Sequence, residues 1–257
     1  MGRILHAAAC SGKGRMEHQI DIHRKAIEGF SAEQILKYAY EQFGSRLTFA
    51  SSLGEEDQVI TDMLSKVTPK IEIFTLDTGR LFPETYELIA KTQKRYPMLF
   101  KVYYPDTKAV EDMVRAKGIN LFYESVENRK LCCGIRKVEP LQRALSNVDA
   151  WITGLRKDQS LTRSDLQPIE WDEANKKIKI NPLWNWSLAQ VHEYIKKNNV
   201  DVNPLHSKGF ISIGCSSCTR AIKPGEDIRA GRWWWEEPES KECGLHNNPK
   251  RKNSDSK

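Results

Sequence analysis

The chain has 257 residues, of which 39% are apolar, so it can build one large α/β domain or two small ones around a buried core. Its formal net charge is +6, and the tail KRKNSDSK at 250–257 supplies +3 of this, four cations less one aspartate. The remaining body is only mildly basic, which gives little support to nucleic-acid binding, and we expect no nucleic-acid partner.

The N-terminal stretch MGRILHAAACSG has one arginine and a short apolar run from Ile4 to Cys10, which is too brief and too weakly charged for a secretory signal. No segment approaches the ~18 apolar residues that a membrane span needs, so we expect no membrane partner. We therefore expect a cytoplasmic protein. In that compartment thiols stay reduced, and clustered cysteines more often bind metal or catalyse reactions than form disulfides.

The first half of the chain alternates between strand and helix patterns. Ser31 and Gln34 form a capping box, which predicts a helix that ends near Gly44. Buried strands are predicted at 46–52, 70–76 and 100–105, and helices with an apolar face follow them at 59–67, 83–96 and 109–118. This alternation predicts an α/β fold with a parallel sheet and helices on both faces.

The second half is less regular. Strand candidates lie at 149–155 and 178–184, and Ser187 caps a predicted helix that runs to residue 199. We interpret residues 1–232 as a single α/β domain and residues 233–257 as a mobile C-terminal segment, whose charged tail we expect to be disordered. The aromatic stretch WWWEE that begins this segment indicates that it folds over something.

Two cysteine pairs indicate a metal site. Cys132 and Cys133 are adjacent, so a disulfide between them would be strained. Cys215 and Cys218 form a C-x-x-C turn, which directs two thiolates at one metal, and the two pairs together can complete a four-sulfur site. An iron–sulfur cluster is favoured over zinc, because zinc ribbons usually supply both pairs from C-x-x-C turns. Buried structural thiols are the alternative without metal.

A further cysteine, Cys243, lies in the polar segment KECGLH with His246 three residues later. An accessible thiolate near cations can act as a nucleophile, and a spare surface thiol is the alternative interpretation. Cys10 has apolar neighbours and no evident partner, so we interpret it as a packing or incidental cysteine.

Anion-binding features occur at predicted strand ends. The loop SSLGEED at 51–57 offers two serines and backbone amides at a helix N-terminus, without the Gly-Lys-Ser/Thr ending of a Walker loop. LDTGR at 76–80 ends the next strand, where ligands of open α/β sheets bind. Guanidinium groups suit phosphate and sulfate oxygens, although scattered arginines are usually solvated or paired. The candidates are Arg156, Arg163, Arg229 and Arg232.

Over roughly residues 45–246 the chain carries, in order, SSLGEED, LDTGR, CCGIRKVEPL, GLRKDQSLTR, NPLH, ISIGCSSCTR, GRWWWEE and KECGLH. In this combination the motifs closely resemble the iron–sulfur adenylylsulfate (APS) reductases of sulfate assimilation, within the wider PAPS/APS reductase family. The double cysteine, the C-x-x-C and the ECGLH segment are the specific elements. The resemblance implies the fold of the adenine-nucleotide α-hydrolase (PP-loop) enzymes.

The resemblance also assigns residues. It implies that Cys132, Cys133, Cys215 and Cys218 hold a four-iron four-sulfur (4Fe-4S) cluster and that Cys243 is the catalytic nucleophile. The positions that match substrate contacts are Ser51, Ser52, Leu76, Thr78, Lys137, Gly154, Arg163, Arg229, Arg232 and His246. One departure is Leu53, because many relatives carry Ser-Phe-Ser in this loop, and it puts the loop's detailed hydrogen bonds in doubt.

The activity that the resemblance implies is reduction of APS to sulfite and AMP through a Cys-S-sulfonate, which thioredoxin or a similar dithiol donor discharges. Within the family, the alternatives are a 3'-phosphoadenylylsulfate (PAPS) reductase or an enzyme that accepts both nucleotides. From another class, the remote alternative is a non-catalytic zinc or iron–sulfur protein that binds nucleic acid. We expect the chain to form a homo-oligomer.

Overall fold

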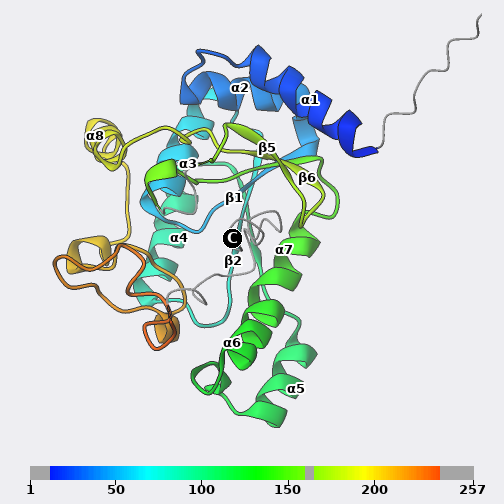
Figure 1. Ribbon diagram of the computed structural model, residues 1–257. Coiled ribbons are helices and arrows are strands. Elements are labelled where there is room, and N and C mark those ends of the chain that lie inside the picture. Colours follow the sequence, from blue (N-terminus) through cyan, green and yellow to red (C-terminus); the bar gives the residue numbers. More distant parts are fainter. Residues whose placement is uncertain (1–11, 160–164, 238–257) are drawn as a thin grey trace, which may run out of the picture.

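The computed structural model describes residues 12–159 and 165–237 (Figure 1). The strands are β1 (Leu47–Ala50), β2 (Glu72–Leu76), β3 (Leu99–Tyr103), β4 (Ala150–Ile152), β5 (Ile169–Asp172) and β6 (Lys177–Ile180). The α-helices are α1 (Gly12–Ala26), α2 (Ala32–Phe43), α3 (Glu55–Val67), α4 (Pro83–Arg95), α5 (Thr107–Lys117), α6 (Val126–Cys133), α7 (Glu139–Ala144) and α8 (Leu188–Asn198).

The strands form one sheet in the order β3-β2-β1-β4-β6-β5. Every pair is parallel except the last, in which β5 runs antiparallel to β6 at the edge. The predicted α/β fold with a parallel sheet is therefore confirmed. Figure 1 shows α1 and α2 at one end of the molecule and α5 and α6 at the other.

Helices cover both faces of the sheet, as the side-chain alternation of its strands requires. Phe49, Ile73 and Ile152 pack on one face in a core that includes residues of α1, α2, α3 and α8. Phe74 and Trp151 come from the same strands as Ile73 and Ile152, but they pack on the opposite face against α7. Because both faces are buried, β1, β2 and β4 are mostly apolar.

Several predicted boundaries are confirmed by cap geometry. Ser31 and Gln34 form the capping box of α2, Ser187 caps α8 in the same way, and Pro83 occupies the first turn of α4. The predicted strand at 178–184 was too long: β6 ends at Ile180, and the Trp184 amide donates to the carbonyl of Asn181 in a turn. No helix in the described residues is long and apolar enough to cross a bilayer.

The parallel strands point their carboxyl ends at one edge of the sheet. Ala50 pairs with Phe74, and Phe49 pairs with Ile152, so the loops after β1, β2 and β4 begin side by side. The chain from Ser212 to Trp233 returns to the same edge, where the amide of Ser216 donates to the carbonyl of Arg80 at 2.8 Å. Segments that are far apart in the sequence thereby meet around one cavity.

Candidate active site

A cavity of about 360 Å³ opens at this edge of the sheet, between the strand ends and the segment 211–233. Its volume is in the range of small-ligand sites. Every predicted substrate-contact residue in the described part of the chain lines this cavity. These residues are Ser51, Ser52, Leu76, Thr78, Lys137, Gly154, Arg229 and Arg232. The structure therefore brings together side chains from five separate segments of the sequence.

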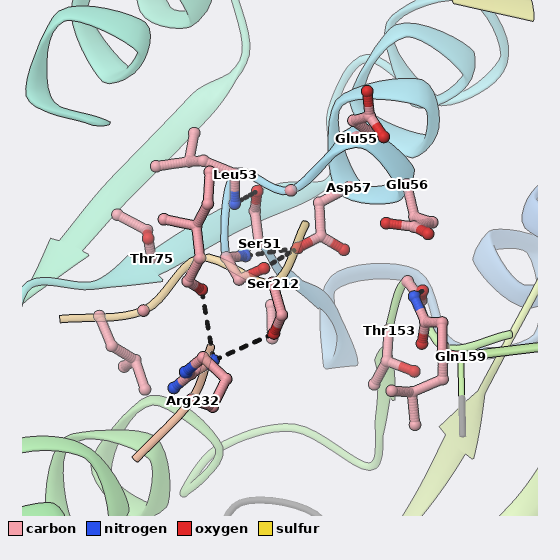
Figure 2. A pocket seen from close by; sticks show the side chains of 18 of the residues that line it. Ser51, Leu53, Glu55, Glu56, Asp57, Thr75, Thr153, Gln159, Ser212 and Arg232 are labelled. Carbon is pink, nitrogen blue, oxygen red and sulfur yellow. Dashed lines mark hydrogen bonds between the residues drawn. The ribbon is translucent and has the colours of Figure 1, made fainter. Parts of the chain in front are cut away.

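The buried side chain of Leu53 holds the serine loop after β1 in place. Leu53 is the position at which this loop differs in sequence from many relatives. Leu53 adopts the left-handed backbone region with φ of 63°, and its side chain is 2% exposed in a cluster with Leu88 and Ile89 of α4. Its amide donates to Ser51 Oγ at 3.2 Å, as Figure 2 shows. A buried leucine here turns the chain sharply and presents both serines to the cavity.

Asp57, in the first turn of α3, is a cavity residue that sequence reasoning missed. Its carboxylate accepts hydrogen bonds from the amide of Ser52 at 2.6 Å and from Ser52 Oγ at 2.7 Å (Figure 2). Burial, with a smaller contribution from the charge of Glu56, raises the pKa of this carboxyl to about 7, against the hydrogen bonds from Ser52 and Gly154 that lower it. The only sequence signal was a third acidic residue just after the glycine that begins the helix.

The four cysteines of the two pairs line a second cavity, and none of them forms a disulfide. Cys132 and Cys133 end α6, and the next turn, Gly134–Val138, widens into a π-helix. Such wide turns often occur at functional sites. The Oγ1 of Thr78, at the end of β2, lies 3.2 Å from Cys215 Sγ.

Positive charge surrounds this cysteine cavity, which Arg80, Arg129, Arg136, Lys137 and Arg232 also line. Burial alone raises the pKa of a thiol, as it does at Cys132 and at Cys218, whose pKa reaches about 12. At Cys215 burial also acts to raise the pKa, but Lys137, the hydrogen bond with Thr78, and two arginines outweigh it and lower the pKa. The cavity therefore favours a thiolate at Cys215, the form that binds metal.

The donor set around the cysteines fits an iron–sulfur cluster. Among the described residues, Arg136 Nε, Arg232 Nε and Trp233 Nε1 are buried without a hydrogen-bond partner, and all three residues line the cysteine cavity. An unpartnered buried donor costs about 1–3 kcal/mol, and the sulfurs of such a cluster accept hydrogen bonds.

A single metal ion fits less well. In the part of the chain that the structure describes, no three His, Cys, Asp or Glu side chains converge closely enough to hold one ion. In a four-iron cluster each thiolate binds its own iron, so its four sulfurs need not converge on one point.

The two cavities share three lining residues, Lys137, Arg232 and Trp233. Trp233 is 1% exposed, and the guanidinium groups of Arg129 and Arg232 each contact its ring, at 4.7 Å from the ring centroid. Its backbone φ of 41° lies in the left-handed region, which costs about 1–3 kcal/mol for such a residue. The tryptophan thus forms part of the wall between the cysteines and the larger cavity.

A buried ion pair anchors segment 233–236 to α6. Arg129 of α6 donates to both carboxylate oxygens of Glu236, at 2.9 and 2.7 Å, and both side chains are almost fully buried. The beginning of the predicted C-terminal segment therefore packs on the helix that carries Cys132 and Cys133.

Some residues that the sequence singled out lie outside the described residues, namely Arg163, Cys243, His246, Cys10 and the tail at 250–257. His206, of the NPLH motif, lines the larger cavity with its Nε2 buried and without a partner among the described residues, and sequence reasoning had given it no role.

Comparison with protein families gives one match over most of the chain: residues 46–221 match the phosphoadenosine phosphosulfate reductase domain. The adenosine 5'-phosphosulfate reductase of Burkholderia cepacia is 54% identical over 209 residues, which cover 80% of this chain and 83% of that protein. The enzyme of the same name from Allochromatium vinosum is 52% identical over 200 residues, 78% of each chain.

Solved structures agree. The crystal structure of phosphoadenylyl-sulfate (PAPS) reductase from Candida auris superposes with a TM-score of 0.69 at 33% identity, over 86% of this chain and all of that one. Yeast FAD synthetase has a TM-score of 0.51 at 17% identity, over 84% of this chain and 71% of the other, which shows a shared fold alone. The predicted PP-loop type of fold is confirmed.

The raised pKa of Asp57 predicts how stability depends on pH. The folded-state pKa of about 7 exceeds the ordinary value of 3.8, so the folded protein holds this proton more tightly than the unfolded chain does. Its contribution to stability is complete below about pH 4, falls progressively between pH 4 and 7, and is lost above pH 7, on the order of 4 kcal/mol in all. Denaturant unfolding of Asp57→Asn should show a flatter pH profile than wild type between pH 4.5 and 7. Parallel profiles would refute this assignment.

Proposed function

The chain belongs to the phosphoadenosine phosphosulfate reductase family and reduces adenosine 5'-phosphosulfate in sulfate assimilation, and we propose that it does so through a covalent S-sulfonate on Cys243. The observation that carries the proposal is that Lys137 and Arg232 line both the nucleotide-sized cavity and the cysteine cavity. These cations can stabilise the negative charge of a group bound between the two cavities.

The lining of the cavity suits the phosphate, the base and the sulfate of the substrate. Ser51, Ser52 and the amides that begin α3 offer hydrogen-bond donors to a phosphate, and the backbone at Leu76 and Gly154 offers contacts to a base. Lys137, Arg229 and Arg232 offer positive charge to the sulfate. In our proposal these cavity residues bind and orient the nucleotide together with Arg163 and His246, which lie outside the described residues.

The chemistry assigned to Cys243 balances without another oxidant or reductant. The thiolate attacks the sulfur of the sulfate, an S–S bond forms, the bond from that sulfur to the phosphate oxygen breaks, and AMP leaves. A thiolate of reduced thioredoxin then attacks Cys243 Sγ, and sulfite leaves with the electron pair of the S–S bond. The second thioredoxin thiol resolves the mixed disulfide, so the two electrons come from thiols. Lys137 and the arginines offset the repulsion between anionic nucleophile and anionic substrate.

In this proposal Cys132, Cys133, Cys215 and Cys218 hold a 4Fe-4S cluster, supported by the unpartnered N–H donors around them. When bound, the cluster would fix the turn that carries Lys137 and so hold that cation near the sulfate. Thioredoxin as the dithiol donor, a homo-oligomeric assembly and a cytoplasmic location complete the proposal.

The ligand assignment predicts the outcome of four substitutions. Cys132→Ser, Cys133→Ser, Cys215→Ser and Cys218→Ser should each lose most of the bound iron and most activity, because a four-thiolate site tolerates few missing ligands. Iron analysis and the visible absorption of anaerobically purified protein would measure this. One variant with full iron and full activity would contradict the assignment, and a colourless wild type that contains zinc would replace the cluster with zinc.

The arginine assignment predicts weaker substrate handling. Arg229→Ala and Arg232→Ala should each lower kcat/KM for adenosine 5'-phosphosulfate by about 5- to 150-fold, the equivalent of about 1–3 kcal/mol for a lost charge-assisted contact. Gly214→Ala should act like Arg232→Ala, because a Cβ there would lie 2.4 Å from Arg232 Nη2 and displace the guanidinium. Arg220→Ala removes a surface pair with Glu226 and serves as the control. If kcat/KM is unchanged in the first three variants, neither Arg229 nor Arg232 takes part in substrate binding.

The nucleophile assignment predicts a stalled intermediate. Wild-type protein mixed with the substrate and no donor thiol should gain the mass of one SO3 unit on Cys243, because no thiol is present to discharge it. Cys243→Ser should keep its iron and its colour, yet form no adduct and release no sulfite, since a hydroxyl ionises too weakly at neutral pH. Peptide mass spectrometry locates the adduct. Its absence, or its presence on another cysteine, would overturn the mechanism.

A further inference from the structure

The carboxylate of Asp57 joins two loops that line the nucleotide cavity, one after β1 and one after β4. It accepts from the amide and the hydroxyl of Ser52, in the loop after β1, and the backbone of Gly154, in the loop after β4, also hydrogen-bonds to it. A Cβ at Gly154 would lie 2.1 Å from Asp57 Oδ1, so the second loop approaches this carboxylate more closely than any residue other than glycine allows. Asp57 therefore contacts both loops at close range.

This arrangement conflicts with anion binding in one respect. A serine hydroxyl carries a single hydrogen, and Ser52 donates it to Asp57 Oδ2 at 2.7 Å. While that bond persists, Ser52 Oγ cannot donate to a phosphate oxygen. The carboxylate of Asp57 also lines the cavity that is to receive a second negative group.

Neighbouring charges do not cancel this negative charge. Asp57 forms no ion pair among the described residues, because Arg156 pairs with Glu56 at 2.9 Å and approaches Asp158 at 3.9 Å. On the same helix, Glu55 is hydrogen-bonded to His192. The remaining charged or titratable groups that line the described cavity are Lys137, His206, Arg229 and Arg232.

The carboxyl of Asp57 gains or loses its proton near neutral pH, so its charge can change when a ligand binds. Burial raises its pKa to about 7, so a substantial fraction is neutral at physiological pH. An oxyanion bound in the same cavity disfavours the charged form further. A neutral carboxyl can still accept from the Ser52 amide and can donate its own proton to Ser52 Oγ, which leaves the serine hydrogen free for the ligand.

We propose that Asp57 is a positioning residue that takes up a proton from solvent when an oxyanion binds at Ser51 and Ser52, and so reverses its hydrogen bond with the Ser52 hydroxyl. The two loops stay joined in both states, but only the neutral state lets Ser52 donate to the ligand. This inference rests on the proposed function in that the oxyanion is the phosphate of the nucleotide.

Calorimetric titration with AMP, in pairs of buffers with different ionisation enthalpies at pH 8, tests the proposal on the cluster-loaded protein. AMP is a dianion at this pH, so its own protonation contributes little. Wild type should take up a fraction of a proton that approaches one per AMP bound. Its AMP affinity should fall by up to tenfold per pH unit between pH 7.5 and 9. Asp57→Asn should lose this uptake and have a flatter affinity profile.

Asp158→Asn is the matched control, because Asp158 lines the same cavity on an exposed side chain and should leave the proton uptake at the wild-type value. An infrared difference spectrum of the wild type on AMP binding provides a measurement that needs no variant: a protonated-carboxyl C=O band should appear. AMP binding without that band, or with equal proton uptake in wild type and Asp57→Asn, would overturn this inference alone. Failure of the wild type to bind AMP would overturn the proposed function as well.

Discussion

Repulsion between negative groups is the constraint on which this structure depends. The proposed reaction brings an anionic nucleophile to an anionic substrate, next to four cysteines that we propose bind metal as thiolates. Lys137 and Arg232 line both the nucleotide cavity and the cysteine cavity, so the same cations can serve all three groups. Their effect on the cysteines is already evident at Cys215, whose pKa falls despite deep burial.

The fold explains how those charges are held in place. Parallel strands deliver the loops after β1, β2 and β4 to one edge of the sheet, and the π-helical turn after Cys133 delivers Lys137 to the same point. The ring of Trp233 contacts the guanidinium groups of both Arg129 and Arg232, and Glu236 pairs with Arg129. The orientation of Arg232 therefore depends on packing next to the cysteines. A cluster bound there would affect the substrate site through the position of Arg232, without carrying electrons.

Much of this arrangement was predictable from the sequence, because it depends on local patterns. The capping residues Ser31 and Ser187 located two helices, the two cysteine pairs indicated a metal site, and the resemblance to the reductase family assigned the cavity residues. The roles of Asp57, His206 and Trp233 were not predictable. An acidic residue in a first helical turn is usually solvated, and the burial of Asp57 arises only when the Gly154 loop packs against it. Likewise, the ion pair of Arg129 with Glu236 joins residues 107 positions apart, which no local pattern encodes.

The central claim is that this cavity converts the sulfate of adenosine 5'-phosphosulfate to sulfite with electrons from thiols alone. Sulfite release by anaerobically purified, iron-loaded protein, with a reduced dithiol donor and no other reductant, tests it most directly. The account predicts one sulfite and one AMP for each disulfide formed in the donor. AMP without sulfite, or no turnover of this nucleotide by protein with full iron content, would contradict it.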